Sequence, residues 1–228
     1  MANIAITGAG RGIGLELARQ YAASGDTVFA LCRNSAASDA LNALSTSSNG
    51  KVKVFEMDVG DDASVRRAAA EIGEESIDVL LNVAGISGPV GNDLESSDWP
   101  AWQEAFNIMT MGPLRVMQGF LPRMNAGAKV INITSQLGAS TWPYGGHYAY
   151  AAAKAGLNRL MRSAAIDLRE RGIIIGLVHP GWVQTDMGGS NADITTEESA
   201  SGIRAVAAAW TLDRSGDFLK WNGETHPW

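Results

Sequence analysis

Short apolar runs of strand length alternate with longer helical patterns along nearly the whole 228-residue chain. Some runs, such as 79–81 and 173–175, are apolar at consecutive positions, which suits strands that are buried on both faces. Strands of this kind form parallel sheets, and right-handed crossovers between them cover both sides of the sheet with helices. We therefore predict a single α/β domain over residues 1–228, a doubly wound Rossmann fold with a seven-stranded parallel sheet.

The alternation also gives approximate bounds for the elements. We expect strands at 2–7, 27–32, 52–57, 77–82, 129–134, 173–179 and 218–221. We expect helices at 13–23, around 41–44, at 61–72, from 99 or 101 to 124, at 147–171 and at 196–212. Asp61 or Asp62 suits a helix cap, and Glu197 and Glu198 suit the first turn of the last helix, where negative charge is favourable.

Composition and charge limit which ligands the protein is expected to bind and in which compartment it is expected to be found. The formal net charge is −6, so any anionic ligand must be held locally by backbone N–H groups and a few arginines. Cys32 is the only cysteine, and the three histidines have no metal-ligand spacing. No run of about 18 apolar residues and no secretory leader is evident. We expect a cytoplasmic protein with no metal site and no nucleic-acid or membrane partner.

Three glycines follow the first predicted strand. Gly8, Gly12 and Gly14 have the spacing Gly-x3-Gly-x-Gly, which differs from the commoner Gly-x-Gly-x-x-Gly. A bound diphosphate needs backbone N–H groups that no side chain obstructs, and the N-terminus of the next helix adds positive potential. The alternative is a tight strand-to-helix turn without a ligand. The strand before the glycines and the helix after them favour a dinucleotide site.

Two arginines bear on the choice of dinucleotide. Arg33 follows the second strand, where sites that prefer NAD commonly have an acidic residue for the ribose hydroxyl. Arg11 lies inside the glycine loop. Two guanidinium groups can clamp a 2′-phosphate, which favours NADP(H), although NAD(H) stays possible. The alternative is that both arginines are ordinary solvated surface residues.

A tyrosine and a lysine are spaced for proton transfer. Tyr150 and Lys154 are four residues apart in a predicted helix, so they share a face. Tyrosine has a reference pKa of about 10, and a neighbouring ammonium favours the phenolate and lowers that value. Such a pair can exchange a proton with a carbonyl or alcohol oxygen. The spacing alone is a weak signal, because an amphipathic helix can present the same two residues to water.

Residues at strand ends strengthen this interpretation. Ser135 follows the strand at 129–134, Asn82-Val83-Ala84-Gly85 ends the strand at 77–82, and His179-Pro180-Gly181 ends the strand at 173–179. Ligands of doubly wound sheets bind at this carboxyl edge. The Ser135 hydroxyl is therefore a candidate partner of the substrate oxygen addressed by Tyr150. We interpret His179 as a structural residue or a neighbour of the nicotinamide.

Taken together, these patterns resemble the short-chain dehydrogenase/reductase family over essentially the whole chain. The matching positions are Thr7-Gly8-x3-Gly12-Ile13-Gly14, Asn82-x-Ala84-Gly85, Asn107, Ser135, Tyr150-x3-Lys154 and Pro180-Gly181. Arg33 and the ending 218–228 resemble its NADP-type members, in particular the C-factor-like proteins and the sniffer-type carbonyl reductases.

The resemblance implies a role for each of these residues. Tyr150 would be the general acid/base, Lys154 would lower its pKa and hold the nicotinamide ribose, and Ser135 would orient the carbonyl. Asn107 would hold a water that links Lys154 to solvent. The implied cofactor-binding residues are Gly8, Arg11, Gly12, Ile13, Gly14, Arg33, Asp58, Val59, Asn82, Ala84, Gly85, Tyr150, Lys154, Pro180, Gly181, Val183 and Thr185.

The sequence also departs from the family pattern near the expected substrate pocket. Val83 replaces a usual asparagine, Ser135 and Tyr150 are 15 residues apart, and the segment after Thr185 is short. A short segment there suggests an open pocket. Three residues are candidates for apolar pocket walls, with core packing as the alternative: Trp142, Trp182 and Met187.

The leading hypothesis is an NADPH-dependent carbonyl reductase or alcohol dehydrogenase acting on a small apolar ketone, aldehyde or the matching alcohol. One alternative is a signalling or sensor protein that binds NADP(H) with little turnover. Another is an NAD-dependent alcohol or dihydrodiol dehydrogenase. By resemblance, the predicted helices at 101–124 and 147–171 pair across a two-fold axis, which implies a homodimer or homotetramer.

Overall fold

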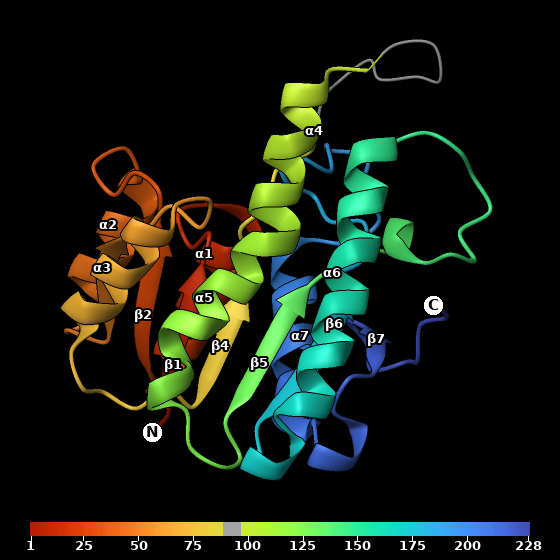
Figure 1. The fold of residues 1–228 in the computed structure, drawn as a ribbon. Coiled ribbons are helices and arrows are strands. Elements are labelled where there is room, and N and C mark those ends of the chain that lie inside the picture. Colours follow the sequence, from red (N-terminus) through yellow and green to blue (C-terminus); the bar gives the residue numbers. More distant parts are fainter. Residues whose placement is uncertain (89–96) are drawn as a thin grey trace.

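The computed structural model describes residues 1–88 and 97–228. Within them, seven parallel strands form one sheet in the order β3-β2-β1-β4-β5-β6-β7 (Figure 1). Helical crossovers join the strands, which confirms the predicted doubly wound fold. The strands are β1 (Asn3–Thr7), β2 (Thr27–Cys32), β3 (Val52–Glu56), β4 (Val79–Asn82), β5 (Lys129–Ile133), β6 (Ile174–His179) and β7 (Phe218–Lys220).

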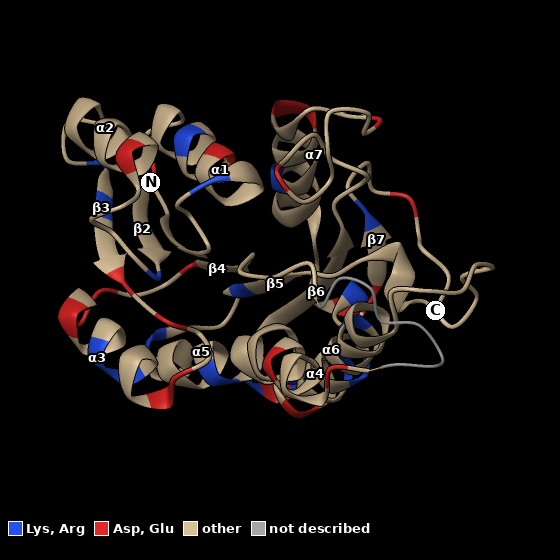
Figure 2. Ribbon diagram, turned by 90° about the horizontal axis from the view of Figure 1, so that it is seen from above, with Lys and Arg blue, Asp and Glu red and all other residues tan. Residues whose placement is uncertain are grey.

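Helices cover both faces of this sheet. Figure 2 shows one layer made of α1 (Gly12–Ala23), α2 (Asp39–Ser47) and α7 (Thr196–Ala209). The opposite layer holds α3 (Asp62–Ile72), α4 (Trp99–Phe106), α5 (Gly112–Phe120) and α6 (Tyr148–Asp167). Among the described residues, none of these helices is both long enough and apolar enough to cross a membrane.

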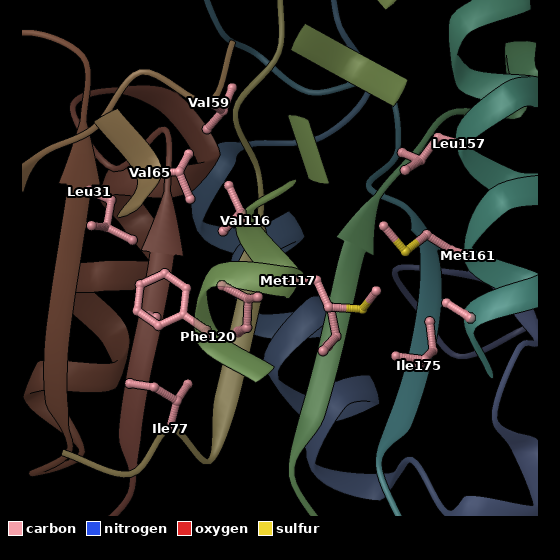
Figure 3. Packing of buried hydrophobic residues seen from close by; sticks show 14 of the residues in the cluster. Leu31, Val59, Val65, Ile77, Val116, Met117, Phe120, Leu157, Met161 and Ile175 are labelled. Carbon is pink, nitrogen blue, oxygen red and sulfur yellow. The ribbon is translucent and has the colours of Figure 1, made fainter. Parts of the chain in front are cut away.

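The hydrophobic core lies between the sheet and these layers. Phe120 and Met117 of α5 and Met161 of α6 are 3% exposed or less, and Figure 3 shows them lying over the strands. Full burial of a side chain of this size stabilises the fold by about 1.5–3 kcal/mol. On the other face, Trp210 packs so closely on β6 that a Cβ atom at Gly176 would lie 2.8 Å from its ring.

The prediction of one continuous helix from residue 101 to 124 is wrong. α4 ends at Phe106, a π-helical turn η1 (Asn107–Met111) follows, and α5 begins at Gly112. The break coincides with Pro113, which has no N–H to donate and disfavours a regular turn before it. The N–H of Gly112 bonds to the carbonyl of Asn107 instead, a five-residue spacing. π-Turns inside helices are frequent at functional sites.

Other predicted bounds differ by a few residues. α6 ends at Asp167 rather than at residue 171, and a short 3₁₀ turn, Arg169–Arg171, completes it. β4 begins at Val79 rather than at residue 77. None of these shifts moves a strand end away from the carboxyl edge. Thr7, Asn82, Ile133 and His179 close β1, β4, β5 and β6 there.

Candidate active site

The glycine turn between β1 and α1 is built by close main-chain approach. Gly8 and Gly12 have φ values of +68° and +54°, which glycine adopts at low cost. A Cβ atom at Gly8 would lie 2.8 Å from Ala84 Cα, and one at Gly14 would lie 2.3 Å from the Gly8 oxygen. Arg11 at the N-cap makes no side-chain cap, so the N-terminus of α1 is open to an anion.

The hydroxyl group of Thr7 holds this turn against the end of β4. Its oxygen accepts hydrogen bonds from the N–H groups of Val83 at 3.0 Å and Ala84 at 3.2 Å. Thr7 is buried, so these bonds are protected from water. Sequence analysis did not assign a role to Thr7, although its place directly before Gly8 was a usable signal.

Ser135, Tyr150 and Lys154 come together at the carboxyl edge. Ser135 follows β5, and its hydroxyl lies close enough to the phenol of Tyr150 on α6 to act on the pKa of that phenol. The Nζ atom of Lys154 lies 5.9 Å from the centroid of the Tyr150 ring and donates to the Ile133 oxygen at 2.7 Å. Three residues that were chosen by spacing in the sequence therefore occupy one corner of the sheet.

The expected lowering of the Tyr150 pKa is wrong for this structure. Burial raises the pKa of Tyr150 above its ordinary value, and the neighbouring Ser135 hydroxyl offsets this only in part. Burial also lowers the pKa of Lys154 to about 8, because the ammonium has lost its hydration. The lysine points at a main-chain oxygen rather than at the phenol. At neutral pH the phenol therefore keeps its proton and can donate it.

The turn after Ser135 rests on α6 through two residues that sequence analysis missed. The Oδ1 atom of Asn158 accepts a 2.6 Å bond from Thr134, and its Nδ2 donates to the Gly138 oxygen at 3.3 Å. A Cβ atom at Gly138 would lie 2.9 Å from the carbonyl carbon of Lys154. A buried asparagine one turn after Lys154 was the signal available in the sequence.

Asn107 faces the loop after β3. Its Nδ2 donates to the Gly60 oxygen at 3.0 Å, and its Oδ1 accepts from Arg115 at 3.0 Å. Arg115 also donates to the Val59 oxygen, and the carboxylate of Asp58 accepts the N–H of Gly60. The Asn107 side chain thus shapes the loop that carries Asp58 and Val59. Its predicted water link to Lys154 stays a prediction.

Asn82 lies inside the sheet. Its side chain is 3% exposed, and its amide donates to Asn132 on β5 at 2.9 Å and to the Pro113 oxygen at 3.3 Å. These bonds hold the end of β4, which carries Ala84 and Gly85 toward the glycine turn. The Nδ2 atom of Asn82 is engaged by these bonds, whereas its buried Oδ1 has no partner among the described residues, and its contact with a cofactor stays a prediction.

The two arginines differ in their surroundings. Arg11 forms a 2.9 Å ion pair with Asp186, and both side chains are about four-fifths exposed. This pair joins the glycine turn to the segment after β6. Arg33 is exposed just beyond β2. The expected clamp of two arginines is therefore not assembled, because one guanidinium is engaged by a carboxylate.

The loop after β6 carries the remaining predicted contacts. Gly181 has a φ of +90° and lies between Ile194 and Trp221, where a Cβ atom would be 2.5 Å from Ile194. Val183 is buried and bridges Ile194, and the hydroxyl of Thr185 accepts the N–H of Gly188 at 3.0 Å. Pro180 precedes this loop directly at the end of β6. The loop is thus ordered by its own hydrogen bonds.

The three candidate pocket residues lie on loops at the carboxyl edge. Trp142 is half-buried and meets Tyr144 edge-on with 5.3 Å between ring centroids. Trp182 and Met187 are 47% and 51% exposed, which is high for large apolar side chains. They are therefore not fillers of the core, which removes the alternative weighed for Trp182 and Met187.

A doubly wound parallel sheet with a glycine turn at its first crossover defines the dinucleotide-binding class of fold. The serine, tyrosine and lysine at its carboxyl edge add a group that can transfer a proton. The model of the short chain dehydrogenase family matches residues 2–195, and the chain belongs to this family of oxidoreductases.

Individual relatives support the resemblance to the C-factor-like and sniffer-type members of this family. C-signal of Myxococcus xanthus is 38% identical over 167 residues, which cover 72% of this chain and all of that protein. The NADPH-bound carbonyl reductase from chicken fatty liver is 32% identical, with a TM-score of 0.91 over 100% of this chain and 99% of its own. The carbonyl reductase Sniffer of D. melanogaster is 27% identical, with a TM-score of 0.92 over 100% of both chains. The likeness to C-factor-like and sniffer-type proteins is confirmed.

Proposed function

We propose that this protein is an NADPH-dependent carbonyl reductase that converts a small apolar ketone or aldehyde to its alcohol. The observation that carries the proposal is the gathering of Ser135, Tyr150 and the buried Lys154 at one corner of the carboxyl edge. A relative of similar size and fold is named as an NADPH-bound carbonyl reductase. Both observations favour carbonyl chemistry with a nicotinamide cofactor.

The residues around the glycine turn fit a dinucleotide. Gly8, Gly12 and Ile13 would leave the N-terminus of α1 open for the diphosphate, since no side-chain cap blocks it. Asp58 and Val59 would flank the adenine. Pro180, Gly181, Val183 and Thr185 would flank the nicotinamide carboxamide. Bound NADPH would supply the hydride.

The 2′-phosphate would be held by Arg33 and Arg11. Arg33 is exposed and can reach a ligand without losing a structural partner, because it makes no ion pair in the described part of the chain. Arg11 would exchange Asp186 for the phosphate. An exposed ion pair is worth about 1 kcal/mol or less, so this exchange is inexpensive.

Tyr150 would act as the acid. Its raised pKa keeps the phenol protonated at neutral pH, so it can donate to a carbonyl oxygen that gains negative charge. The Ser135 hydroxyl would donate to the same oxygen and orient it. The pKa of Lys154, about 8, lets it exchange protons near neutral pH, and its Nζ would have to leave the Ile133 oxygen to return a proton toward Tyr150.

The decisive experiment compares Tyr150→Phe with Tyr148→Phe. Tyr148 is on the same helix but has Ala152, not lysine, four residues later. We expect Tyr150→Phe to lower kcat/KM on a panel of aldehydes, ketones and quinones by at least about 100-fold. The Kd for NADPH, followed by tryptophan fluorescence, should change less than about twofold while Tyr148→Phe stays active. Undiminished turnover in Tyr150→Phe would refute the role.

A second candidate function is signalling with bound NADP(H) and little turnover. The similarity to C-signal supports it. Tyr150→Phe separates the two functions, because a sensor would keep its biological effect without the phenol. The NAD-dependent alternative predicts equal or better kcat/KM with NADH than with NADPH, which a direct comparison tests.

We also propose a homo-oligomer, as in the family pattern. Met111 on η1 and Ile166 on α6 are 45% and 69% exposed, so the two long helical segments carry apolar side chains on their outside. Small alanine side chains on α6 would allow a second helix to approach closely; Ala149 and Ala165 are buried in the chain's own core, whereas Ala151, Ala152 and Ala155 keep accessible surface. Light scattering coupled to gel filtration distinguishes monomer, dimer and tetramer.

A further inference from the structure

The segment Ser135–Thr141, here called the serine turn, rests on α6 through the bond between Asn158 and the Gly138 oxygen. At Gln136 the turn borders a cavity of about 200 Å³, which is also lined by His179 and Trp182 among others. Packing around Gln136 is therefore incomplete, and directed contacts contribute to the position of the turn there.

His179 makes the first of these contacts. Its Nδ1 atom accepts a 3.3 Å hydrogen bond from the main-chain N–H of Gln136, the residue after Ser135. A ring nitrogen can accept only when it carries no proton, so the bond requires the neutral imidazole with its proton on Nε2. Burial, together with the facing groups His226 and Lys220, lowers the pKa of His179 to about 4. The acceptor is therefore present at neutral pH.

The end of the described chain holds His179 in place. After β7 the chain reverses at Asn222–Gly223 and returns beside the strand, with Thr225 bridging Leu219. The His226 ring stacks on Phe218 at 4.4 Å between centroids and meets the His179 ring edge-on at 5.6 Å. The imidazole of His179 is thereby fixed by an aromatic neighbour.

Trp228 makes the second contact with the serine turn. Its main-chain oxygen accepts hydrogen bonds from the Ser140 hydroxyl at 2.9 Å and from the Thr141 N–H at 3.2 Å. The Trp228 ring is itself held, with the Arg162 guanidinium 5.2 Å from its centroid and the Phe218 ring at 5.9 Å. Residues 226–228, here called the C-terminal strap, thus reach both ends of the serine turn, one directly and one through His179.

We propose that His179 and the C-terminal strap are positioning elements for the substrate carbonyl, acting through the serine turn. This inference rests on the proposed function, because it assigns them the orientation of the carbonyl that Ser135 receives. The Ser135 hydroxyl is placed by the main chain of the turn, and a misplacement of 1 Å at a reacting group can cost about 100-fold in rate. The glycine turn and the loop of Asp58 lie on other elements, but His179 directly precedes Pro180 and Gly181, so the Kd for NADPH is measured beside KM to separate an effect on the carbonyl from one on the nicotinamide.

The contacts of Trp228 with the serine turn also bear on the loop that is expected to border the substrate. Thr141 is followed directly by Trp142, which packs on Tyr144, and both rings belong to the loop that leads into α6. A displacement of Thr141 would therefore move the loop walls together with the turn. The expected result is a larger KM for the carbonyl and weaker discrimination between its two faces, with unchanged affinity for NADPH.

A matched pair of variants tests the His179 contact. Asparagine places Oδ1 where histidine places Nδ1, so His179→Asn keeps an acceptor for the Gln136 N–H, whereas His179→Leu has the same branching and no acceptor. We expect His179→Leu to raise KM for the carbonyl at least about tenfold, and His179→Asn to stay within about threefold of the parent. The Kd for NADPH should change less than twofold in both. Trp228→Ala should raise KM in the same direction, and Trp228→Phe less so.

Hydrogen exchange of the turn gives a readout that does not need turnover. In the full chain, the Gln136 amide should lose protection in His179→Leu and keep it in His179→Asn. Unchanged protection in His179→Leu, or lost protection with unchanged KM and stereochemistry, overturns the inference. If the parent protein reduces no carbonyl of the panel while Tyr150→Phe behaves like it, the proposed function fails, and the exchange measurement still decides whether His179 holds the turn.

Discussion

The Nζ atom of Lys154 donates a 2.7 Å hydrogen bond to the main-chain oxygen of Ile133, the last residue of β5. The ammonium is fully buried and its pKa is lowered to about 8. Lys154 thus connects α6, which also carries Tyr150, to β5, the strand that Ser135 follows. The same bond keeps the cation away from the phenol, which explains why burial dominates the pKa of Tyr150 in this structure.

The buried lysine predicts a pH-dependent stability. Between pH 8 and its ordinary value of 10.5, the folded state releases the Lys154 proton while the unfolded state keeps it. Stability therefore rises with pH in this window. Relative to Lys154→Met, the parent should gain about 2 kcal/mol in free energy of unfolding between pH 8 and 9.5. Urea unfolding measures the difference. Lys53→Met, at an exposed position of β3, is the control for the loss of a lysine elsewhere in the protein. A constant difference over this range would contradict the prediction.

The glycine turn predicts a separation of folding from cofactor binding. Gly14→Ala puts a Cβ 2.3 Å from the Gly8 oxygen, a main-chain atom that cannot move aside, so we expect a loss of about 3 kcal/mol in stability. Gly12→Ala meets only the Thr185 methyl at 3.4 Å but keeps a positive φ, which costs about 1–2 kcal/mol. The affinity for NADPH should fall sharply in Gly12→Ala, although this variant loses less stability than Gly14→Ala. Unimpaired stability of Gly14→Ala would argue against this geometry.

Arg33 predicts a cofactor preference. If Arg33 meets the 2′-phosphate, Arg33→Ala removes a charge-assisted hydrogen bond worth about 1.5–3 kcal/mol, equivalent to roughly 10–100-fold in the Kd for NADPH. NADH has no such phosphate, so its Kd should stay within about twofold. Fluorescence titration with both cofactors measures the effect, and Arg66→Ala on α3 serves as the control for a lost surface arginine. Equal losses for NADH and NADPH would rule out the contact.

His179 predicts sensitivity to acid. Its folded-state pKa of about 4 lies below the ordinary 6.5, so the unfolded state binds more protons between these values. The stabilising contribution is complete above pH 6.5 and is lost as the pH falls toward 4. Between pH 6.5 and 4.5 the parent should lose about 2 to 3 kcal/mol more than His179→Asn, which cannot take up this proton. Chemical unfolding at these pH values is the measurement, and identical acid slopes in the two proteins would disprove it.

The sheet could be predicted from the sequence because each buried strand appears as a short run of consecutive apolar residues. Strands such as Ile174–His179 are apolar on both faces, and helices with one apolar face separate them. The carboxyl edge follows from this order, so Ser135 and Tyr150 could be brought together from spacing alone. Pro113 was visible too, but the π-turn before it could not be predicted from the proline alone; a Cβ atom at Gly112, where the turn ends, would lie 3.2 Å from Val59, a contact that the sequence does not reveal.

The remaining features depend on contacts between residues that are far apart in the chain. Burial, which sets the pKa of Tyr150, is a property of all surrounding elements together. The His179–Gln136 bond spans 43 residues and the Ser140–Trp228 bond spans 88, and no local pattern encodes either. Asn82 and Asn107 were recognised by their positions, while the direction of their side chains is fixed by Asn132 and Gly60.

The serine turn is fastened at Gly138 to α6 and at Thr141 to Trp228, and the N–H of Trp142 bonds back to the Ala139 oxygen. Within the described part of the chain, residues 143–146 have no hydrogen bond to these elements before α6 begins at Tyr148, and Tyr144 contacts Trp142 through its ring alone. We therefore expect that the length and side chains of 143–146 can change while the proton donor and its strand stay in place. New substrates can then be reached by replacing one surface segment, and libraries confined to these four positions are the direct route to altered selectivity.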